Sequence, residues 1–256
     1  MKATRWIPLF VLLAGALSAA PAGRILVLIG EDEYHTWETL PAFCDAELRP
    51  RGYEVTIVQE DPREKNHFPG LVRELPRADV LLLSTRRRTP RREELQAVRD
   101  FLNRGGGLAG IRTACHGFAL LPRTQLTDPR LDHWETFDPE VLGGNYRTHY
   151  RGNDLTQVTL APGAESSPIL RGVRAEDLIG HGELYEVRPL VADARPLLIG
   201  TIPHEPSEPI AWTHYYGPRH DPIFYTSLGA PEDFKEPAFR RLLVNAIGWC
   251  EQSRRR

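Results

Sequence analysis

ILVLIG, residues 25–30, is an unbroken apolar run that ends in a glycine. A run of this kind is typical of a parallel strand that is buried on both of its faces. Similar runs recur three times in the first half of the chain, at residues 55–58, 78–83 and 108–111. Helical patterns separate these runs, over residues 37–48, 71–75 and 89–104. This alternation predicts right-handed βαβ crossovers and a mainly parallel sheet that is covered by helices.

The helix before the fourth strand carries start and stop signals in the sequence. Thr89 is a suitable N-cap, and Pro90 suits the first turn. Gly105-Gly106-Gly107 follows the last apolar position of the helical stripe and should end the helix. We therefore expect a helix that begins after Thr89 and ends before Gly105.

The second half of the chain departs from this alternation. Residues 122–153 show no regular period, and a loop of this length is usually functional, which suggests a lid over the sheet edge. Shorter strands are predicted at residues 155–160, 184–187, 197–202, 210–214 and 223–228. A helix with one apolar face, from Phe239 to Cys250, closes the chain. The expected fold is α/β, with a single doubly wound, mainly parallel, flavodoxin-like sheet and an antiparallel extension in the C-terminal half.

Length and charge limit the organisation and the partners of the protein. With 256 residues, 41% of them hydrophobic, the chain can bury one substantial core. The net charge of −2 provides no global basic field, so we expect no nucleic-acid partner. The arginines at positions 86–88 and in the tail at 254–256 form either a solvated surface or an anion-binding rim.

The N-terminus has the pattern of a secretory signal peptide over residues 1–20. A short basic stretch, residues 1–5, precedes an apolar run from Trp6 to Ala16 and the small residues Ser18-Ala19-Ala20. The apolar run is shorter than the roughly 20 residues that a membrane span needs. We therefore predict one mature domain over residues 21–256, exported to the periplasm or the extracellular space, with no stable membrane insertion.

The predicted topology indicates where the chemistry should lie, because ligands of open α/β sheets bind beyond the carboxyl ends of the strands. The residues after the predicted strands that should converge there include Glu31, Tyr34, His35, Arg112, Thr113, Cys115 and His116. Later segments add Trp134, Tyr146, His149, Glu183 and Tyr185, whereas His181 taken alone is interpreted as a structural histidine. Arg112 ends an apolar strand, where an unpaired charge would be costly, so it requires an internal carboxylate or a substrate group as partner. Aromatic rings, carboxylates and imidazoles together suit a polyhydroxylated ligand.

The chain resembles the ThuA-like (trehalose-utilisation) family. The segments that carry the resemblance are residues 105–118, 141–149, 167–173, 183–187, 209–213, 224–229 and 237–247. The resemblance implies a class I glutamine amidotransferase-like fold and a role in the metabolism of trehalose and related sugars. It also implies that glutaminase activity is absent. Arg112 occupies the position of the nucleophilic cysteine, and Ala230 precedes Pro231-Glu232, where that fold carries its catalytic histidine.

Three functional hypotheses follow. In the first, the protein processes a small-molecule carbohydrate, a trehalose-type sugar or a keto-sugar, by acid/base chemistry. Arg112 would orient the substrate, His116 or His149 with Glu183 would transfer protons, and Tyr34, Trp134 and Tyr146 would stack on the ring. In the second, the same surface binds a carbohydrate without turnover. In the third, Cys115 is the nucleophile of a PfpI-like cysteine hydrolase or the thiol of a redox protein.

A metal site is a further hypothesis. His35, His149, His181, His214 and Glu183 are suitable ligands for a divalent ion such as zinc or manganese. Their spacing contains no H-x-x-x-H or H-E-x-x-H motif, so distant segments would have to assemble the site. The cofactor is accordingly left open.

Overall fold

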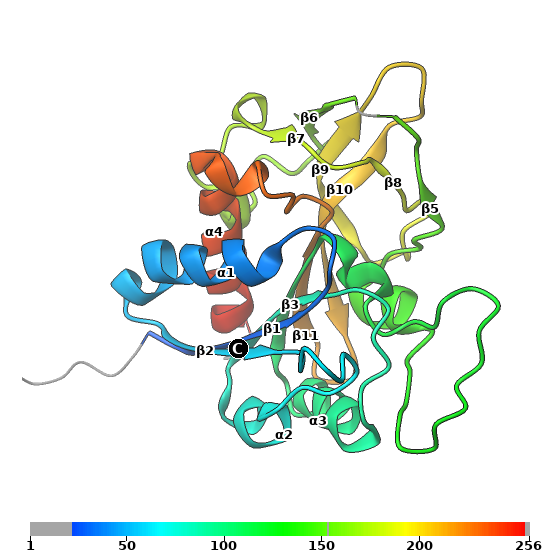
Figure 1. Cartoon of the computed structure of the whole chain (residues 1–256). Helices are drawn as coiled ribbons and strands as arrows, with labels where there is room; N and C mark the ends of the chain where they lie inside the picture. Colours follow the sequence, from blue (N-terminus) through cyan, green and yellow to red (C-terminus); the bar gives the residue numbers. More distant parts are fainter. Residues whose placement is uncertain (1–21, 153, 254–256) are drawn as a thin grey trace, which may run out of the picture.

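The structure is a computed structural model that describes residues 22–152 and 154–253. The predicted signal peptide, residues 1–20, lies outside the described residues. Within them, nine strands form one sheet in the order β2-β1-β3-β4-β11-β10-β9-β6-β7 (Figure 1). The parallel part comprises β2 (Glu54–Gln59), β1 (Arg24–Gly30), β3 (Val80–Thr85), β4 (Gly107–Ile111) and β11 (Asp221–Thr226). This mixed sheet with helices confirms the predicted α/β fold class.

The antiparallel extension begins at β11 and follows the hairpin that the sequence indicates. It comprises β10 (Glu208–Tyr216), β9 (Arg195–Thr201), β6 (Thr156–Leu160) and β7 (Ile179–Gly180). Two very short strands, β5 (Thr148–His149) and β8 (Tyr185–Glu186), form a separate ladder in which His149 lies opposite Tyr185. This ladder connects the irregular segment to the part of the chain that carries Glu183.

Helices cover both faces of the sheet, as Figure 1 shows. α1 (Thr36–Phe43) and α4 (Pro237–Ser253) lie on one face, whereas α2 (Leu71–Glu74) and α3 (Arg92–Asn103) lie on the other. Alternate residues of β1 contribute to the two cores, because successive strand side chains point to opposite faces. The predicted apolar face of α4 is fully buried, and each large side chain in it contributes roughly 1.5–3 kcal/mol of burial free energy.

The start of α3 differs from the expectation. The N-cap is Arg91 rather than Thr89, and the Glu94 carboxylate accepts a hydrogen bond from the Arg91 amide at 3.1 Å. The Thr89 amide instead donates to the Asn66 side chain at 2.9 Å. Thr89 is therefore held in the preceding loop, and the helix begins two residues after Pro90.

The irregular segment forms a lid only in part. Its first portion is anchored beside the start of α3, where the Arg92 amide donates to the Arg130 carbonyl and the Asp132 amide donates to the Pro90 carbonyl. A π-helical turn over Asp138–Leu142 follows. The later portion, which leads to β5, carries Tyr146, whose ring stacks on His116 in the turn after β4. No helix in the described ranges is long and apolar enough to cross a membrane.

The strand order determines which loops meet. β1 lies between β2 and β3 in the sheet. After β1 the chain forms β2 on one side of β1, and it then crosses back to form β3 on the other side. The loops after β1 and β3 therefore diverge at this switch point, and Gly30 and Thr85, their last strand residues, are neighbours in register. All three cysteines, Cys44, Cys115 and Cys250, are free and buried.

Candidate functional site

Arg112 forms the base of the candidate site. It directly follows β4 with a φ angle of 49°, and it is only 2% exposed. Its Nη1 donates to the carbonyls of Glu183 and Ser227 at 3.0 and 2.7 Å, and its Nη2 donates to the Tyr34 hydroxyl at 3.2 Å. The guanidinium also lies over the rings of Tyr34 and Tyr185, 4.4 and 4.5 Å from their centroids. The protein supplies partners for both terminal nitrogens of the guanidinium, whereas the buried Nε has no hydrogen-bond partner among the described residues. Because the side chain is almost completely enclosed, the predicted substrate contact of Arg112 is corrected to a positioning role.

Glu183 is the carboxylate that Arg112 holds in place. Its Oε2 accepts hydrogen bonds from Arg112 Nη2 at 3.2 Å and from the Tyr34 hydroxyl at 3.1 Å. Partial burial raises the pKa of Glu183, but a backbone hydrogen bond and the charge of Arg112 outweigh it, so the net pKa is lowered. The side chain is 38% exposed. An ionised, oriented carboxylate is therefore presented to solvent at neutral pH.

A cavity of about 340 Å³ lies against Glu183, and we call it the edge pocket. Its walls come from the loop after β1, the segments on either side of β6 and β7, and the turn after β11. They comprise Glu33, Tyr34, Gly152, Asp154, His181, Gly182, Glu183, Ala230, Pro231 and Glu232. The pocket thus lies where the parallel strands end, at the edge that the topology rule indicates. Its four carboxylates provide hydrogen-bond acceptors and its rim is acidic.

His181 presents an oriented imidazole to the edge pocket. Its Nδ1 lies 2.8 Å from Oδ1 of Asp233, and its backbone amide donates to the same oxygen at 3.0 Å. Asp233 is 1% exposed, and its Oδ2 accepts the amides of Gly229 and Ala230 at 2.7 and 2.9 Å. A neutral imidazole that donates from Nδ1 keeps its lone pair on Nε2, which has no hydrogen-bond partner in the described part of the chain. His181 therefore has the geometry of a general base.

Sequence reasoning did not assign His181 to the catalytic group. The sequence predicts it as a structural histidine or a metal ligand, because its partner Asp233 lies 52 residues further along the chain. The available signal is the turn at residues 229–233, which follows a strand and ends in a carboxylate. The histidine that contacts this carboxylate comes from the segment before β8 and not from the position before Pro231-Glu232.

His116 and Cys115 lie beneath the edge and are poorly suited to the roles predicted for them. His116 is 7% exposed, lies 3.2 Å from the Cys115 sulfur through its Nδ1, and stacks on Tyr146 at 4.4 Å. Burial, supported by the charges of Arg87 and Arg86, lowers the pKa of His116 to about 3. Its imidazole stays neutral near pH 7, so the expectation that it titrates there is wrong. Burial also raises the pKa of Cys115 well above its ordinary value, which argues against a reactive thiolate.

Glu31 shapes the loop after β1 instead of reaching a ligand. Its Oε2 accepts the amides of Glu33 and Tyr34, both at 2.6 Å. Its Oε1 accepts the amide and the hydroxyl of Thr36, both at 2.7 Å. The carboxylate is 2% exposed. Its predicted contact with substrate is thus corrected: Glu31 organises the loop that carries Tyr34.

Two more predicted contacts lie inside the protein. The Trp134 indole donates to Glu140 at 2.9 Å, and its ring packs under the guanidinium of Arg99 at 4.0 Å and against Phe137. This ring is a core element, which corrects the expectation that it stacks on a sugar. Thr113 is completely buried. Tyr146 and Tyr185 do belong to the same aromatic group, with ring centroids 4.9 Å apart.

The histidines proposed as metal ligands are dispersed. His35 is exposed and stacks on Trp37, His214 contacts the Val141 carbonyl through Nδ1, and His149 is exposed on β5. His181 is held by Asp233. Among residues 22–152 and 154–253, no three His, Cys, Asp or Glu side chains are grouped so that they could hold a metal ion. The four histidines therefore do not form one coordination sphere.

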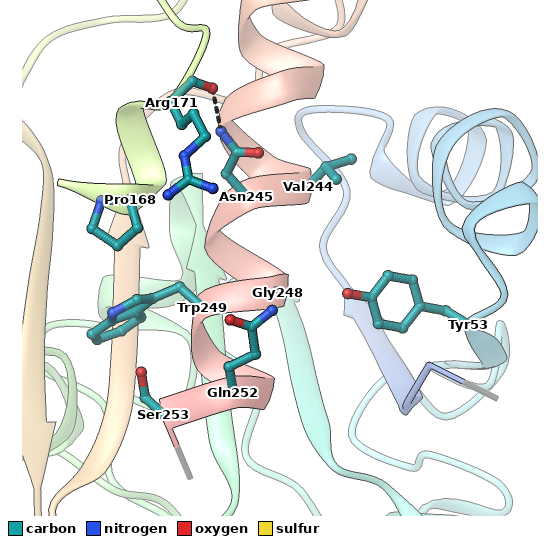
Figure 2. A pocket seen from close by; sticks show the side chains of 9 residues that line it. All are labelled: Tyr53, Pro168, Arg171, Val244, Asn245, Gly248, Trp249, Gln252 and Ser253. Carbon is teal, nitrogen blue, oxygen red and sulfur yellow. Dashed lines mark hydrogen bonds between the residues drawn. The ribbon is translucent and has the colours of Figure 1, made fainter. Parts of the chain in front are cut away.

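Another cavity, of about 430 Å³, lies on the outer side of α4. Figure 2 shows Trp249, Gly248 and Asn245 of α4 together with Tyr53 and Arg171 around it. The Asn245 amide already donates to the carbonyls of Ile169 and Arg171. Although this cavity is larger, it brings together no oriented acid/base pair, so we place the candidate site at the edge pocket.

With this geometry established, the relationship to known proteins is clear. The model of the ThuA family, which is described as trehalose utilisation, matches residues 24–250. The chain belongs to the ThuA family. No curated protein matches the sequence.

Solved ThuA-like proteins share the architecture of this family member. One from Bacteroides uniformis ATCC 8492 is 19% identical with a TM-score of 0.66, and the match covers 93% of this chain and 94% of the other. One from Parabacteroides merdae ATCC 43184 is 14% identical with a TM-score of 0.66 and 91% coverage of both chains. An exo-β-1,4-mannosidase from an Opitutaceae bacterium is 13% identical with a TM-score of 0.50, over 87% of this chain and 35% of that one. At these identities the likeness shows the fold alone.

In this ThuA chain, Arg112 occupies the turn after β4 with a left-handed φ of 49°. Its side chain turns inward to Tyr34 and Tyr185. The hydroxyl of Tyr225 donates to the Arg112 carbonyl at 2.6 Å and fixes the turn from below. The strained turn therefore serves to hold a cation in the protein interior.

Proposed function

We propose that the protein processes a sugar or glycoside of the trehalose or keto-sugar type in the edge pocket by acid/base chemistry. His181 would act as the general base through Nε2, and Glu183 would bind substrate hydroxyls or exchange a proton with them. The observation that carries the proposal is that His181, held by the buried Asp233, lines the same cavity as the carboxylate fixed by Arg112 and Tyr34.

The chemistry of the pocket supports this assignment. An imidazole whose Nδ1 is bonded to a carboxylate is a common general base, because the carboxylate stabilises the imidazolium that forms. The acidic rim, which includes Glu33, Asp154 and Glu232, can accept hydrogen bonds from several hydroxyls of a sugar. A keto-sugar would also offer an acidic C–H next to its carbonyl, a proton that an oriented imidazole can remove.

The family supports a role in trehalose utilisation and leaves the reaction open. Within the proposal, the protein takes a proton from substrate at Nε2 of His181 and returns one to product. Arg112 and Asp233 do not touch substrate in this scheme and act as positioning residues. Tyr34 contributes a ring edge and a hydroxyl that stays protonated, since burial raises the pKa of Tyr34.

The test is proton NMR of protein that begins near Pro21, mixed with trehalose, other disaccharides and their keto derivatives, with and without added zinc or manganese. We expect new sugar signals with the wild-type protein and a loss of at least about 100-fold in their rate of appearance in His181→Ala and Glu183→Gln. His149→Ala is a suitable control, because His149 is exposed on β5 and does not line the pocket.

The outcomes separate the candidate functions. Unchanged turnover in both His181→Ala and Glu183→Gln would reject the assignment of the site. Line broadening of a sugar without new signals, in all metal conditions, would support the alternative of a carbohydrate-binding protein. Loss of turnover in His149→Ala alone would transfer the proton-transfer role to the β5–β8 ladder.

Export is part of the proposal and rests on residues 1–20. Their basic, apolar and small-residue regions follow one another as in a secretory leader. Expression of the full chain followed by cell fractionation and N-terminal sequencing tests it. A mature N-terminus near Pro21 outside the cytoplasm is expected, and an intact Met1 terminus in the cytoplasm would refute export.

A further inference from the structure

A second hollow lies on the other side of the loop that carries Tyr34. Trp37, in the first turn of α1, lines a cavity of about 200 Å³ together with Asp32, Gln59, Glu60 and Lys65. The indole is 36% exposed, which is unusual for a tryptophan in a folded domain. We call this cavity the Trp37 pocket. Nothing in the proposed acid/base chemistry makes use of it.

The Trp37 ring is held in position before any ligand binds. His35 stacks on it with ring centroids 4.6 Å apart and an angle of 26° between the planes. The left-handed backbone of His35, with a φ of 51°, turns the chain so that the two rings meet. A preorganised aromatic ring loses little conformational entropy on binding, which favours a ligand that stacks a ring face on the indole.

The charged groups in the wall of the Trp37 pocket all have partners within the protein. Lys65 forms ion pairs with Asp32 and Glu60. Arg88, behind the wall, bonds Asp32 at 2.7 Å and Glu60 at 2.5 and 3.0 Å. The third carboxylate of the wall, Glu31, is bonded within its own loop, so an ionic ligand would have to break an existing interaction. Neutral hydroxyl groups, by contrast, can donate to the carboxylates and accept from the ammonium without disturbing the network.

The loop after β1 separates this hollow from the edge pocket. Glu31 and Asp32 line the Trp37 pocket, whereas Glu33 and Tyr34 line the edge pocket. Both cavities therefore lie at the carboxyl ends of the parallel strands, on the two sides of four consecutive residues. The volume of the Trp37 pocket is below the roughly 300–1,000 Å³ of sites for drug-sized ligands, which limits it to about one ring.

We infer that the Trp37 pocket is a binding site for one neutral, unphosphorylated sugar ring, which stacks on the Trp37 indole while Asp32, Gln59, Glu60 and Lys65 bond its hydroxyls. The inference rests on the proposed function for the identity of the ligand as a sugar. It adds a second position at which a saccharide contacts the protein, outside the acid/base group.

The experiment uses protein that begins near Pro21 and carries Glu183→Gln, so that turnover does not consume the probes. Binding of glucose, trehalose and glucose 6-phosphate is followed by tryptophan fluorescence and by saturation-transfer NMR. Trp37→Ala in this background should weaken glucose and trehalose binding by at least about tenfold, through lost ring contact. Trp37→Phe should recover most of the affinity, and Trp249→Ala, at the α4 cavity, should leave it unchanged.

The results decide between distinct possibilities. Equal affinity in Trp37→Ala and its parent, with both variants melting at the same temperature, overturns the inference. Tighter binding of glucose 6-phosphate than of glucose also overturns it, because the paired charges would not select a neutral ring. A further outcome is that the wild-type protein turns over no sugar while saturation transfer from the Trp37 ring to glucose is still observed. That result would support the Trp37 pocket as a binding site and would reject the proposed acid/base function.

Discussion

Nδ1 of His181 and Oδ1 of Asp233 lie 2.8 Å apart, although 52 residues separate them in the chain. The aspartate accepts four hydrogen bonds, from the imidazole, from the amide of His181 and from the amides of Gly229 and Ala230. It therefore ties the turn after β11 to the segment before β8 and fixes the imidazole between them. The Asp233 carboxylate therefore both orients the His181 imidazole and holds the turn that forms one wall of the edge pocket.

Asp233→Asn should separate these two effects. Asparagine keeps one oxygen for the backbone amides, but its amino group donates to Nδ1 instead of accepting from it, which places the imidazole proton on Nε2 and removes the basic lone pair there. We expect kcat/KM for the responsive sugar to fall by about 100-fold or more, with a moderate decrease in melting temperature. A variant that melts earlier yet turns over at the wild-type rate would show that Asp233 has only a structural role.

Gly182→Ala tests the link between the pocket wall and the buried arginine. A Cβ at position 182 would overlap the guanidinium of Arg112. The guanidinium must then move away from Glu183, and we expect a destabilisation of about 1–3 kcal/mol together with weaker sugar binding. Gly248→Ala is the matched control, because its Cβ meets only the Tyr53 hydroxyl at 3.5 Å and alanine favours the helical conformation of α4. Denaturant unfolding of both variants provides the comparison, and equal stability would contradict the predicted overlap.

Asp138 should make stability depend on pH. Burial raises the pKa of this carboxyl from 3.8 to about 7, while its Oδ2 accepts the Tyr146 amide at 2.6 Å. The folded protein therefore retains a proton that the unfolded chain releases from about pH 4 upward, so the stabilisation is complete below that pH and lost as the pH rises through 7.

The measurement is the free energy of unfolding between pH 5 and 8. Wild type should lose roughly 3 kcal/mol of stability relative to Asp138→Asn between pH 5 and pH 7, with little further change above pH 7. Asparagine is the appropriate replacement because it keeps the acceptor for Tyr146 and removes the titration. Parallel pH profiles of the two proteins would show that Asp138 does not carry the dependence.

Cys115 should behave as an inert thiol. It is 3% exposed, and burial raises its pKa well above the ordinary value, so little thiolate exists at neutral pH. We expect alkylation by iodoacetamide at pH 7 to proceed far more slowly in the native protein than in the unfolded chain. Cys115→Ala should retain turnover, and its abolition in a folded Cys115→Ala protein would revive the cysteine-hydrolase hypothesis.

Local patterns in the sequence were sufficient to predict the parallel part of the sheet. The apolar runs in β1, β3 and β4 are buried on both faces, whereas the run in the edge strand β2 is only partly buried. The spacing of the runs leaves room for helices of ordinary length. The same logic indicated that Arg112 needs a partner, since a charge at the end of such a strand is costly. Glu183 as that partner could not be derived, because 71 residues separate the two.

The remaining errors share a physical cause. Residue type and loop position do not show whether a polar group is already bonded within the protein. Glu31 gives both of its oxygens to its own loop, and Trp134 gives its ring to Arg99 and Phe137. His181 shows the converse, because an apparently ordinary histidine becomes a candidate base once Asp233 is placed beside it. Whether a polar side chain bonds to the protein or is free to bond a ligand is decided by tertiary contacts.

The position of Arg112 has a consequence for any attempt to redesign this scaffold. One guanidinium joins the loop after β1 through Tyr34, the segment before β8 through Glu183, and the strand end at Ser227. A change in the backbone of any one of these three segments would move the Arg112 guanidinium, and the other two segments would lose their hydrogen bonds to it. Altered ligand preference should therefore be sought by exchanging side chains on the pocket rim, whereas grafting whole loops would dismantle the shared support.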